Sequence, residues 1–96
     1  MNYRKKSNNV SMEIAYKPRF IRQFGKLVPD LQEEVESTIE LLRDRENYKR
    51  LKVHKLHGPL AGCYSCSVNY NYRIVFIYEG TDQVILLAVG DHDVYR

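Results

Sequence analysis

The sequence contains no long hydrophobic run, and this excludes one class of protein at the outset. Crossing a bilayer takes about 20 consecutive apolar residues, and no stretch of these 96 residues approaches that length. The basic start, with Arg4, Lys5 and Lys6, is not followed by the apolar segment of a signal peptide. We therefore expect a cytoplasmic protein with no membrane partner. A chain of this length builds a single core and hence one domain.

Cysteine is scarce: the only two are Cys63 and Cys66. Their CxxC spacing is typical of redox motifs at the start of a helix and of zinc sites, but a structural zinc site needs two further ligands close by. Here the pair lies in a segment with the composition of a strand, where residues three apart point to opposite faces. One metal ion or one disulfide could not easily hold both side chains. We predict two reduced cysteines, no metal site and no small-molecule cofactor.

Acidic residues are missing from two stretches of the chain. Residues 1–27 contain a single acid, Glu13, and residues 47–57 contain none. Between them, residues 30–46 are rich in acids, so the net charge of +3 conceals alternating basic and acidic segments. This alternation favours one face that binds a polyanion. Surface helices of mixed charge would give the same composition, so the pattern alone does not decide.

Hydrophobic periodicity predicts the first half of an α+β domain. Residues 1–11 are polar and aperiodic, which predicts a flexible tail, and residues 12–96 form the domain. A short alternating strand at residues 12–16 comes first. Two helices then begin at Pro18 and Pro29, since proline is tolerated in a first helical turn and apolar residues recur on one face of each segment.

The second half of the chain is predicted to be mostly strand. Three runs rich in β-branched and aromatic residues, 63–68, 72–78 and 84–89, are separated by compositions typical of tight turns. The expected order is therefore β-α-α-β-β-β. It predicts an α+β fold in which a helical hairpin packs on a small antiparallel sheet.

Three segments resemble a known family. They are residues 55–66, KLHGPLAGCYSC; residues 71–76, NYRIVF; and residues 90–96, GDHDVYR. In this order they are similar to the RelE/ParE toxin superfamily, and the last segment resembles the ending of its YafQ-like and HigB-like branch, which has a catalytic histidine. The resemblance covers residues 12–96 and agrees with the predicted order of elements.

The resemblance implies the toxin of a type II toxin–antitoxin system, an endoribonuclease that cuts mRNA in the ribosomal A site and so inhibits translation. Its partners would be a cognate antitoxin and the ribosome carrying mRNA. A ribose 2′-OH attacks its own adjacent phosphate, so the substrate supplies the nucleophile and no metal is needed. The protein must supply a general base, positive charge for the phosphorane, and an acid for the leaving 5′-oxygen.

Arg73 and His92 are the first candidates for these roles. A guanidinium in an apolar strand is costly unless it is paired, and the planar fork of Arg73 suits two phosphate oxygens. The structural alternative is an ion pair with Asp91 or Asp93. His92 is the candidate acid because histidine titrates near neutral pH. That assignment depends on the resemblance, since a lone surface histidine is usually inert.

The other candidates lie at the C-terminus and on the acid-free segment of residues 47–57, called the basic loop below. By the same resemblance, Tyr95 would stack on or orient a base, unless it simply packs on the core. His57 or Lys55 could act as the general base, and Lys52 and His54 could hold backbone phosphates. The sequence does not choose among these basic residues.

Two other functions remain open from the sequence. Members of the ParE-type branch share the fold and inhibit DNA gyrase without being enzymes. The histidines and lysines near the sheet edge argue against that branch, because a pure binding module needs no titratable cluster there. The other possibility is a basic domain that binds RNA without cleaving it.

Overall fold

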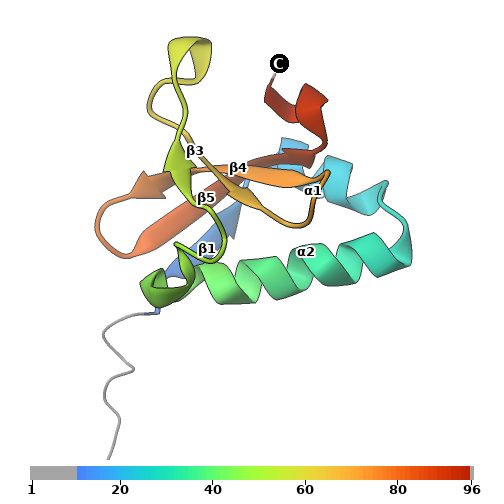
Figure 1. Ribbon diagram of the computed structural model, residues 1–96, viewed down its shortest axis with the longest axis horizontal. Helices are drawn as coiled ribbons and strands as arrows, with labels where there is room; N and C mark the ends of the chain where they lie inside the picture. The colour runs from blue at the N-terminus through green and yellow to red at the C-terminus, as the bar shows by residue number, and fades with distance from the viewer. Residues whose placement is uncertain (1–10, 96) are drawn as a thin grey trace, which may run out of the picture.

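The protein folds into a five-stranded sheet with two helices (Figure 1). The computed structural model describes residues 11–95. In chain order its helices and strands are β1 (Glu13–Tyr16), α1 (Pro18–Gly25), α2 (Pro29–Leu42), β2 (His54–Lys55), β3 (Tyr64–Ser67), β4 (Arg73–Glu79) and β5 (Gln83–Gly90). Three short 3-10 helices are η1 (Arg45–Asn47), η2 (Gly58–Leu60) and η3 (His92–Tyr95). The predicted α+β fold, with two consecutive helices packed on a sheet, is confirmed.

The sheet is mixed, which corrects one part of the prediction. Its strands lie in the order β1-β5-β4-β3-β2. The β3–β4 and β4–β5 pairs are antiparallel, as expected, and the β2–β3 pair is antiparallel too, whereas β1 runs parallel to β5. Periodicity in residues 12–16 predicts a strand but not its partner, and a parallel pair requires a long crossover such as the one through both helices. The two-residue strand β2 was not predicted and extends the sheet at the edge opposite β1.

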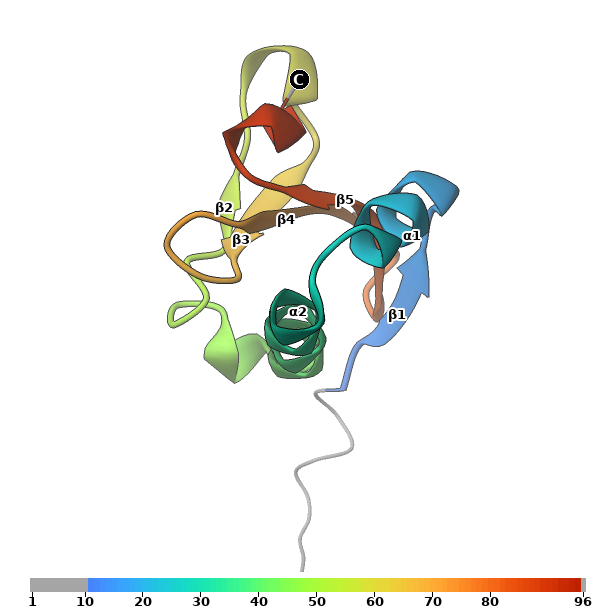
Figure 2. The same cartoon turned by 90° about the vertical axis from the view of Figure 1, so that its right-hand side faces the viewer.

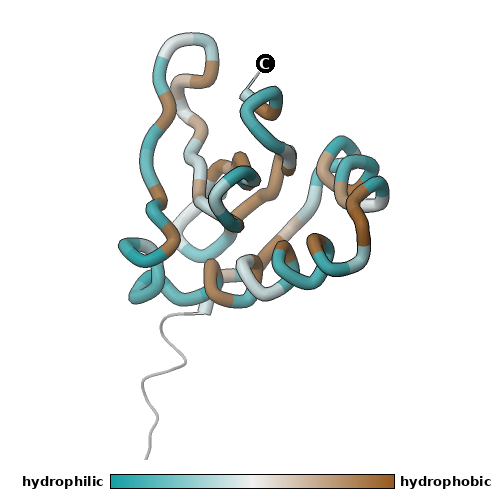
Figure 3. Tube along the Cα trace, turned by 45° about the vertical axis from the view of Figure 1, so that its right-hand side comes forward, coloured by the Kyte–Doolittle hydropathy of each residue, from teal (hydrophilic) through white to brown (hydrophobic). Residues whose placement is uncertain are grey.

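The main core lies between one face of the sheet and the helices. Its buried members include Phe20 of α1, Val35 and Leu42 of α2, and Phe76 and Leu86 of the sheet. In Figure 3 hydrophobic and hydrophilic stretches alternate along α2, as expected for a helix that buries one side. None of the described helices is long and apolar enough to cross a membrane.

The opposite face of the sheet is covered by η3. Val94, which is buried, packs there against Val75 of β4 and Ala88 of β5. Figure 2 shows α2 on one side of the sheet and η3, in red, on the other. The sheet is therefore buried on both faces near the end of β5, although only one face is covered by a full helix.

The two cysteines lie on opposite faces, as predicted. Cys66 is fully buried in the main core, whereas Cys63 packs with the smaller cluster under η3, and both are free thiols. Burial raises the pKa of the Cys66 thiol to about 12, and the charge of Arg73 opposes that rise. At neutral pH Cys66 is thus a protonated core side chain.

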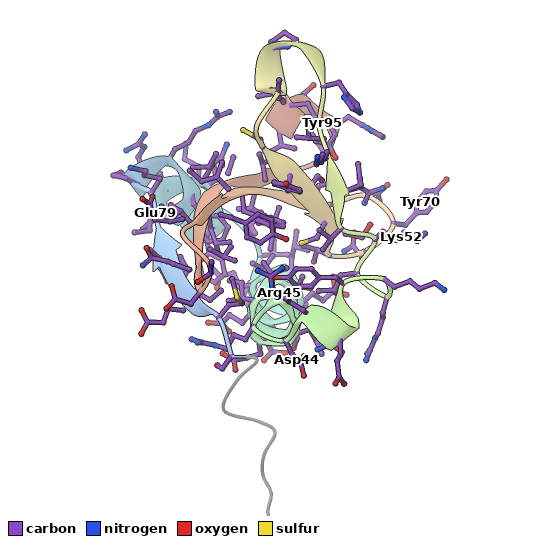
Figure 4. The ribbon with its side chains drawn as sticks, turned by 90° about the vertical axis from the view of Figure 1, so that its left-hand side faces the viewer. Asp44, Arg45, Lys52, Tyr70, Glu79 and Tyr95 are labelled. Carbon is purple, nitrogen blue, oxygen red and sulfur yellow. The ribbon has the colours of Figure 1, made fainter. Side chains whose placement is uncertain are left out.

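An aromatic cluster closes the core where η1 meets the sheet. Tyr64, Phe76 and Tyr78 contact one another at ring-centroid distances of 4.7–5.8 Å, and Tyr48 lies 6.5 Å from Tyr78. The Arg45 guanidinium lies 5.3 Å from the Tyr78 ring centroid, within range of a cation–π interaction (Figure 4). Through this cluster, the segment that follows α2 is held against β3 and β4.

Of the predicted tail, residues 1–11, only Ser11 is among the described residues. It forms an isolated antiparallel bridge with Asp44, and the next residue, Met12, is buried and donates from its backbone nitrogen to the Arg43 carbonyl at 2.8 Å. The rest of the predicted tail lies outside the described residues.

Candidate functional site

The face of the sheet beneath η3 carries a row of residues in register. His54 lies opposite Ser65, Ser65 opposite Val75, and Val75 opposite Ala88. Cross-strand partners share a face of a sheet, and Val94 covers Val75 and Ala88. His54 and Ser65 therefore lie on the η3 side. Strand alternation places Lys55, paired with Tyr64, on the opposite side.

An open groove of about 300 Å³ lies between η3 and the loop that contains η2. Its lining residues are His54, Leu56, His57, Pro59, Leu60 and Tyr95. The structure thus brings together three of the predicted site residues, Tyr95, His54 and His57. In Figure 4 Tyr95 lies beside the loop that forms the other wall. Two imidazoles and one phenol ring can therefore reach a ligand in the same groove.

The His54 ring is oriented by the backbone. Its Nδ1 lies 2.8 Å from the carbonyl oxygen of Lys52. A carbonyl can only accept a hydrogen bond, so Nδ1 carries the proton and donates it. In the neutral ring, Nε2 is then the nitrogen with the lone pair. Lys52 itself is exposed and has φ 59°, the left-handed region.

Tyr95 is held by a buried serine. Its hydroxyl lies 2.8 Å from the hydroxyl of Ser65, which is fully buried in β3. This bond holds the Tyr95 hydroxyl against β3, and Tyr95 also lines the groove. Sequence reasoning did not single out Ser65, although a lone polar residue at a buried strand position is the pattern that indicates such a partner.

Arg73 is paired with the backbone of the turn between β3 and β4. Its Nη1 donates to the carbonyls of Asn69, Tyr70 and Tyr72, at 2.7, 3.4 and 3.1 Å. The Asn69 side-chain oxygen accepts from the backbone nitrogens of Asn71 and Tyr72, both at 2.9 Å. Arg73 is therefore a turn-stabilising residue. These three bonds all come from Nη1, so they do not occupy the Nε and Nη2 edge.

His92 begins η3 and is exposed. Two hydrogen bonds to Asp91 fix the start of η3. The backbone nitrogen of Val94 donates to the Asp91 carbonyl at 2.9 Å, and the backbone nitrogen of Asp93 donates to the Asp91 carboxylate at 3.0 Å. Residues three apart lie on the same side of a 3-10 helix, so His92 lies on the same side of η3 as Tyr95.

Arg73 and His92 share one end of the sheet. Arg73, the first residue of β4, pairs with Gly90, and His92 follows two residues later. Neither of them lines the groove. The exposed Lys55 does not line it either. Among residues 11–95, no cluster of three or more histidine, cysteine, aspartate or glutamate side chains is placed to hold a metal ion.

Several solved structures share this fold. The toxin–antitoxin complex RelBE2 from Mycobacterium tuberculosis has a TM-score of 0.71 and 22% identity, over 86% of this chain and 100% of that one. YafQ from E. coli strain BL21(DE3) has a TM-score of 0.71 and 15% identity, over 88% and 97%. The archaeal RelE–RelB complex from Pyrococcus horikoshii OT3 has a TM-score of 0.67 and 14% identity, over 84% and 94%. At sequence identities of 14–22%, these similarities show that the chain shares the fold of these proteins.

Sequence comparison shows the family. A search of curated proteins gave no match, but the family model described as "ParE toxin of type II toxin-antitoxin system, parDE" matches residues 14–94. That range includes every described strand of the sheet except the first residue of β1. The resemblance to the RelE/ParE superfamily found in the sequence is thereby confirmed. The chain belongs to the ParE toxin family of type II toxin–antitoxin systems.

Proposed function

We propose that this protein is a ribosome-dependent mRNA endonuclease, acting as the toxin of its toxin–antitoxin system. The observation that carries the proposal is the groove in which His54, His57 and Tyr95 meet. Imidazoles can take up or release protons near neutral pH, and an aromatic ring can stack on an unpaired base. Such groups can transfer the protons of an RNA cleavage reaction and can position a base of single-stranded RNA.

The chemistry follows from the substrate. A base on the loop (His54, His57 or Lys55) removes the proton of a ribose 2′-OH, and that oxygen attacks the adjacent phosphorus. The bond from phosphorus to the 5′-oxygen then breaks, and His92 donates a proton to the leaving oxygen. The products are a 2′,3′-cyclic phosphate and a 5′-hydroxyl. The free edge of Arg73 is the candidate partner for the charge that develops on the phosphorane.

The basic loop supports an RNA substrate. Between Asn47 and His57 the chain carries no acid, and its exposed cations are Lys49, Arg50, Lys52 and Lys55. Such residues bind backbone phosphates without sequence preference. Ribosomal alignment of the mRNA would supply the in-line geometry that the open groove does not impose. Such an enzyme works in the cytoplasm.

We further propose that a protein antitoxin holds this toxin inactive. The similar structure from M. tuberculosis is a toxin–antitoxin complex, and the one from P. horikoshii is a RelE–RelB complex. Membership of the same toxin family supports an equivalent partner for this chain. The antitoxin would have to keep RNA out of the groove or move η3, which carries Tyr95.

The second candidate function is inhibition of DNA gyrase without catalysis. The match to the ParE family model favours it. The groove favours the nuclease, because a surface that only binds a protein does not require two imidazoles beside an aromatic ring. The two candidates differ in their cellular target, so one experiment can separate them.

That experiment expresses the protein in growing cells and maps mRNA 5′ ends by primer extension, alongside the supercoiling of a reporter plasmid. The proposal expects new ends inside coding frames, with plasmid supercoiling unchanged. His92→Gln should remove these ends, whereas Lys26→Gln changes an exposed cation that directly follows α1 and does not line the groove, so this control should retain them. Relaxed plasmid with intact mRNA would instead identify a gyrase inhibitor.

A further inference from the structure

We propose that His54 is the general base of this site and that the backbone carbonyl of Lys52 holds its imidazole in the reactive tautomer. The inference rests on the proposed function and selects one of the three bases left open above. It also changes the role of Lys52, from a side chain that binds phosphate to a backbone group that orients a base.

The tautomer follows from the hydrogen bond. With Nδ1 donating to the Lys52 carbonyl at 2.8 Å, the lone pair of the neutral ring is on Nε2. A base that is oriented by a third group is the arrangement found where a histidine takes a proton from a hydroxyl. Nε2 of His54 is thus prepared to accept the proton of the 2′-OH.

The backbone at Lys52 adopts an unfavourable conformation that serves this hydrogen bond. Among the described residues, Lys52 is the only non-glycine residue with a positive φ, a region in which the Cβ of an ordinary residue is crowded. Its backbone nitrogen donates to the Lys49 carbonyl at 3.1 Å, and Val53 donates to Tyr48 at 3.0 Å, so the surrounding turn imposes the conformation. Such strain concentrates at functional sites.

The other two candidate bases lack this preparation. The ring of His57 lines the groove but makes no hydrogen bond to residues 11–95 that would fix its tautomer. Lys55 lies on the other side of β2. His54, in contrast, faces Ser65 across the strand pair, and Ser65 holds Tyr95. The base and the stacking ring are thereby fixed to the same two strands.

The decisive experiment measures single-turnover cleavage of mRNA on programmed ribosomes from pH 5.5 to 8.5. A His54→Ala protein should cleave at least about 100-fold more slowly than wild type and lose the rise of rate with pH. Added imidazole should restore part of its rate, because His54 is exposed and its place is open to solvent. His57→Ala is the matched control and should keep the pH dependence and gain nothing from imidazole. The other titratable groups on this side of the sheet, Tyr95 and His92, are unchanged in both variants, and so are the neighbouring charges of Lys52 and Lys55.

A second pair of variants tests the role of the Lys52 carbonyl. Lys52→Gly and Lys52→Val both remove the ammonium, but only glycine accepts a positive φ without strain. The glycine variant loses only the ammonium and should cleave at least about 10-fold faster than the valine variant, which should be as slow as His54→Ala while its melting temperature shows that it is folded. Equal losses in both variants would overturn the carbonyl role and restore the phosphate role.

The assignment of His54 can fail separately from the proposed function. Cleavage by His54→Ala at the wild-type rate and pH dependence would overturn it, and so would imidazole rescue of His57→Ala instead. In either case wild-type cleavage of ribosome-bound mRNA would leave the nuclease proposal standing. If the wild-type protein leaves that mRNA intact, the proposed function fails and the assignment fails with it.

Discussion

At the scale of single residues, the Arg73 guanidinium stabilises the turn that precedes β4. The cost of a guanidinium in an apolar strand predicts that it has a partner, but the sequence offers Asp91, Asp93 or a phosphate as partners. Its Nη1 instead bonds three carbonyls of the preceding turn. The sequence does not reveal these partners, because every residue has a backbone carbonyl. Only the folded turn brings three carbonyls within reach of one guanidinium nitrogen.

The Arg73 pairing predicts two separable effects. Arg73→Ala should lower the free energy of unfolding by about 1–3 kcal/mol, because three carbonyls lose a charged donor, and should also abolish toxicity. Asn69→Ala is the matched control, since it loosens the same turn by removing the bonds to Asn71 and Tyr72 but leaves the guanidinium. Chemical denaturation and a growth assay measure the two effects. If both variants lose toxicity equally, Arg73 acts only through the turn.

The Ser65–Tyr95 bond is testable by a double-mutant cycle. Ser65→Ala and Tyr95→Phe should each lower the free energy of unfolding by about 1 kcal/mol, and the double variant should lose little more than either, because they remove the same hydrogen bond. Tyr95→Phe keeps the ring and should retain most of the cleavage rate, whereas Tyr95→Ala should not. Additive losses in the cycle would show that the two hydroxyls are not coupled in solution.

At the scale of elements, the two helices and four of the five strands could be predicted from periodicity and composition, but the partners of the strands could not. The strand pairing β1–β5 joins residues about 70 positions apart, and neither strand contains information about the other. The strand β2 has only two residues, which are too few to show an alternation of polar and apolar side chains. The basic segment that contains it therefore looks like a loop in the sequence. The groove between this segment and η3 depends on the β2–β3 pairing. The sequence could therefore name candidate residues but could not show that His54, His57 and Tyr95 meet in one groove.

The aromatic cluster between η1 and the sheet predicts a loss of stability at alkaline pH. Burial raises the pKa of Tyr48, and the neighbouring Tyr78 hydroxyl raises it further. Burial also raises the pKa values of Tyr78 and of Cys66, the latter to about 12. Each group binds its proton more tightly in the folded state than in the unfolded chain. Its contribution to the free energy of unfolding is therefore complete below the pKa that it has in the unfolded chain. This contribution is lost as pH rises from about 9 towards 12.

A Tyr48→Phe variant tests the origin of this alkaline loss. The Tyr48 hydroxyl is buried and has no hydrogen bond of good geometry to residues 11–95. Its removal should leave the free energy of unfolding at pH 7 unchanged or raise it by about 1 kcal/mol, and should reduce the decline above pH 9. Urea denaturation at pH 7 and pH 10 measures both. A large destabilisation at pH 7 would mean that the hydroxyl has a partner in solution.

At the scale of the whole molecule, the groove and η3 lie on the side of the sheet opposite the acid-rich α2 (Figure 2). The turn between η1 and β2, which carries Lys49, Arg50 and Lys52, lies beside the end of α2 instead. The alternating charge of the sequence does not predict where these segments lie in the fold. Family membership makes the chain a toxin. The chemistry of the groove is what favours RNA as its target.

The most direct test of that claim is to identify the ends produced on mRNA held in a purified programmed ribosome. The proposed mechanism expects cleavage at the A-site codon, with a 2′,3′-cyclic phosphate on one fragment and a 5′-hydroxyl on the other, and little cleavage of the same RNA when it is free. Intact mRNA under these conditions, together with inhibition of the supercoiling activity of purified gyrase at the same protein concentration, would contradict the nuclease mechanism.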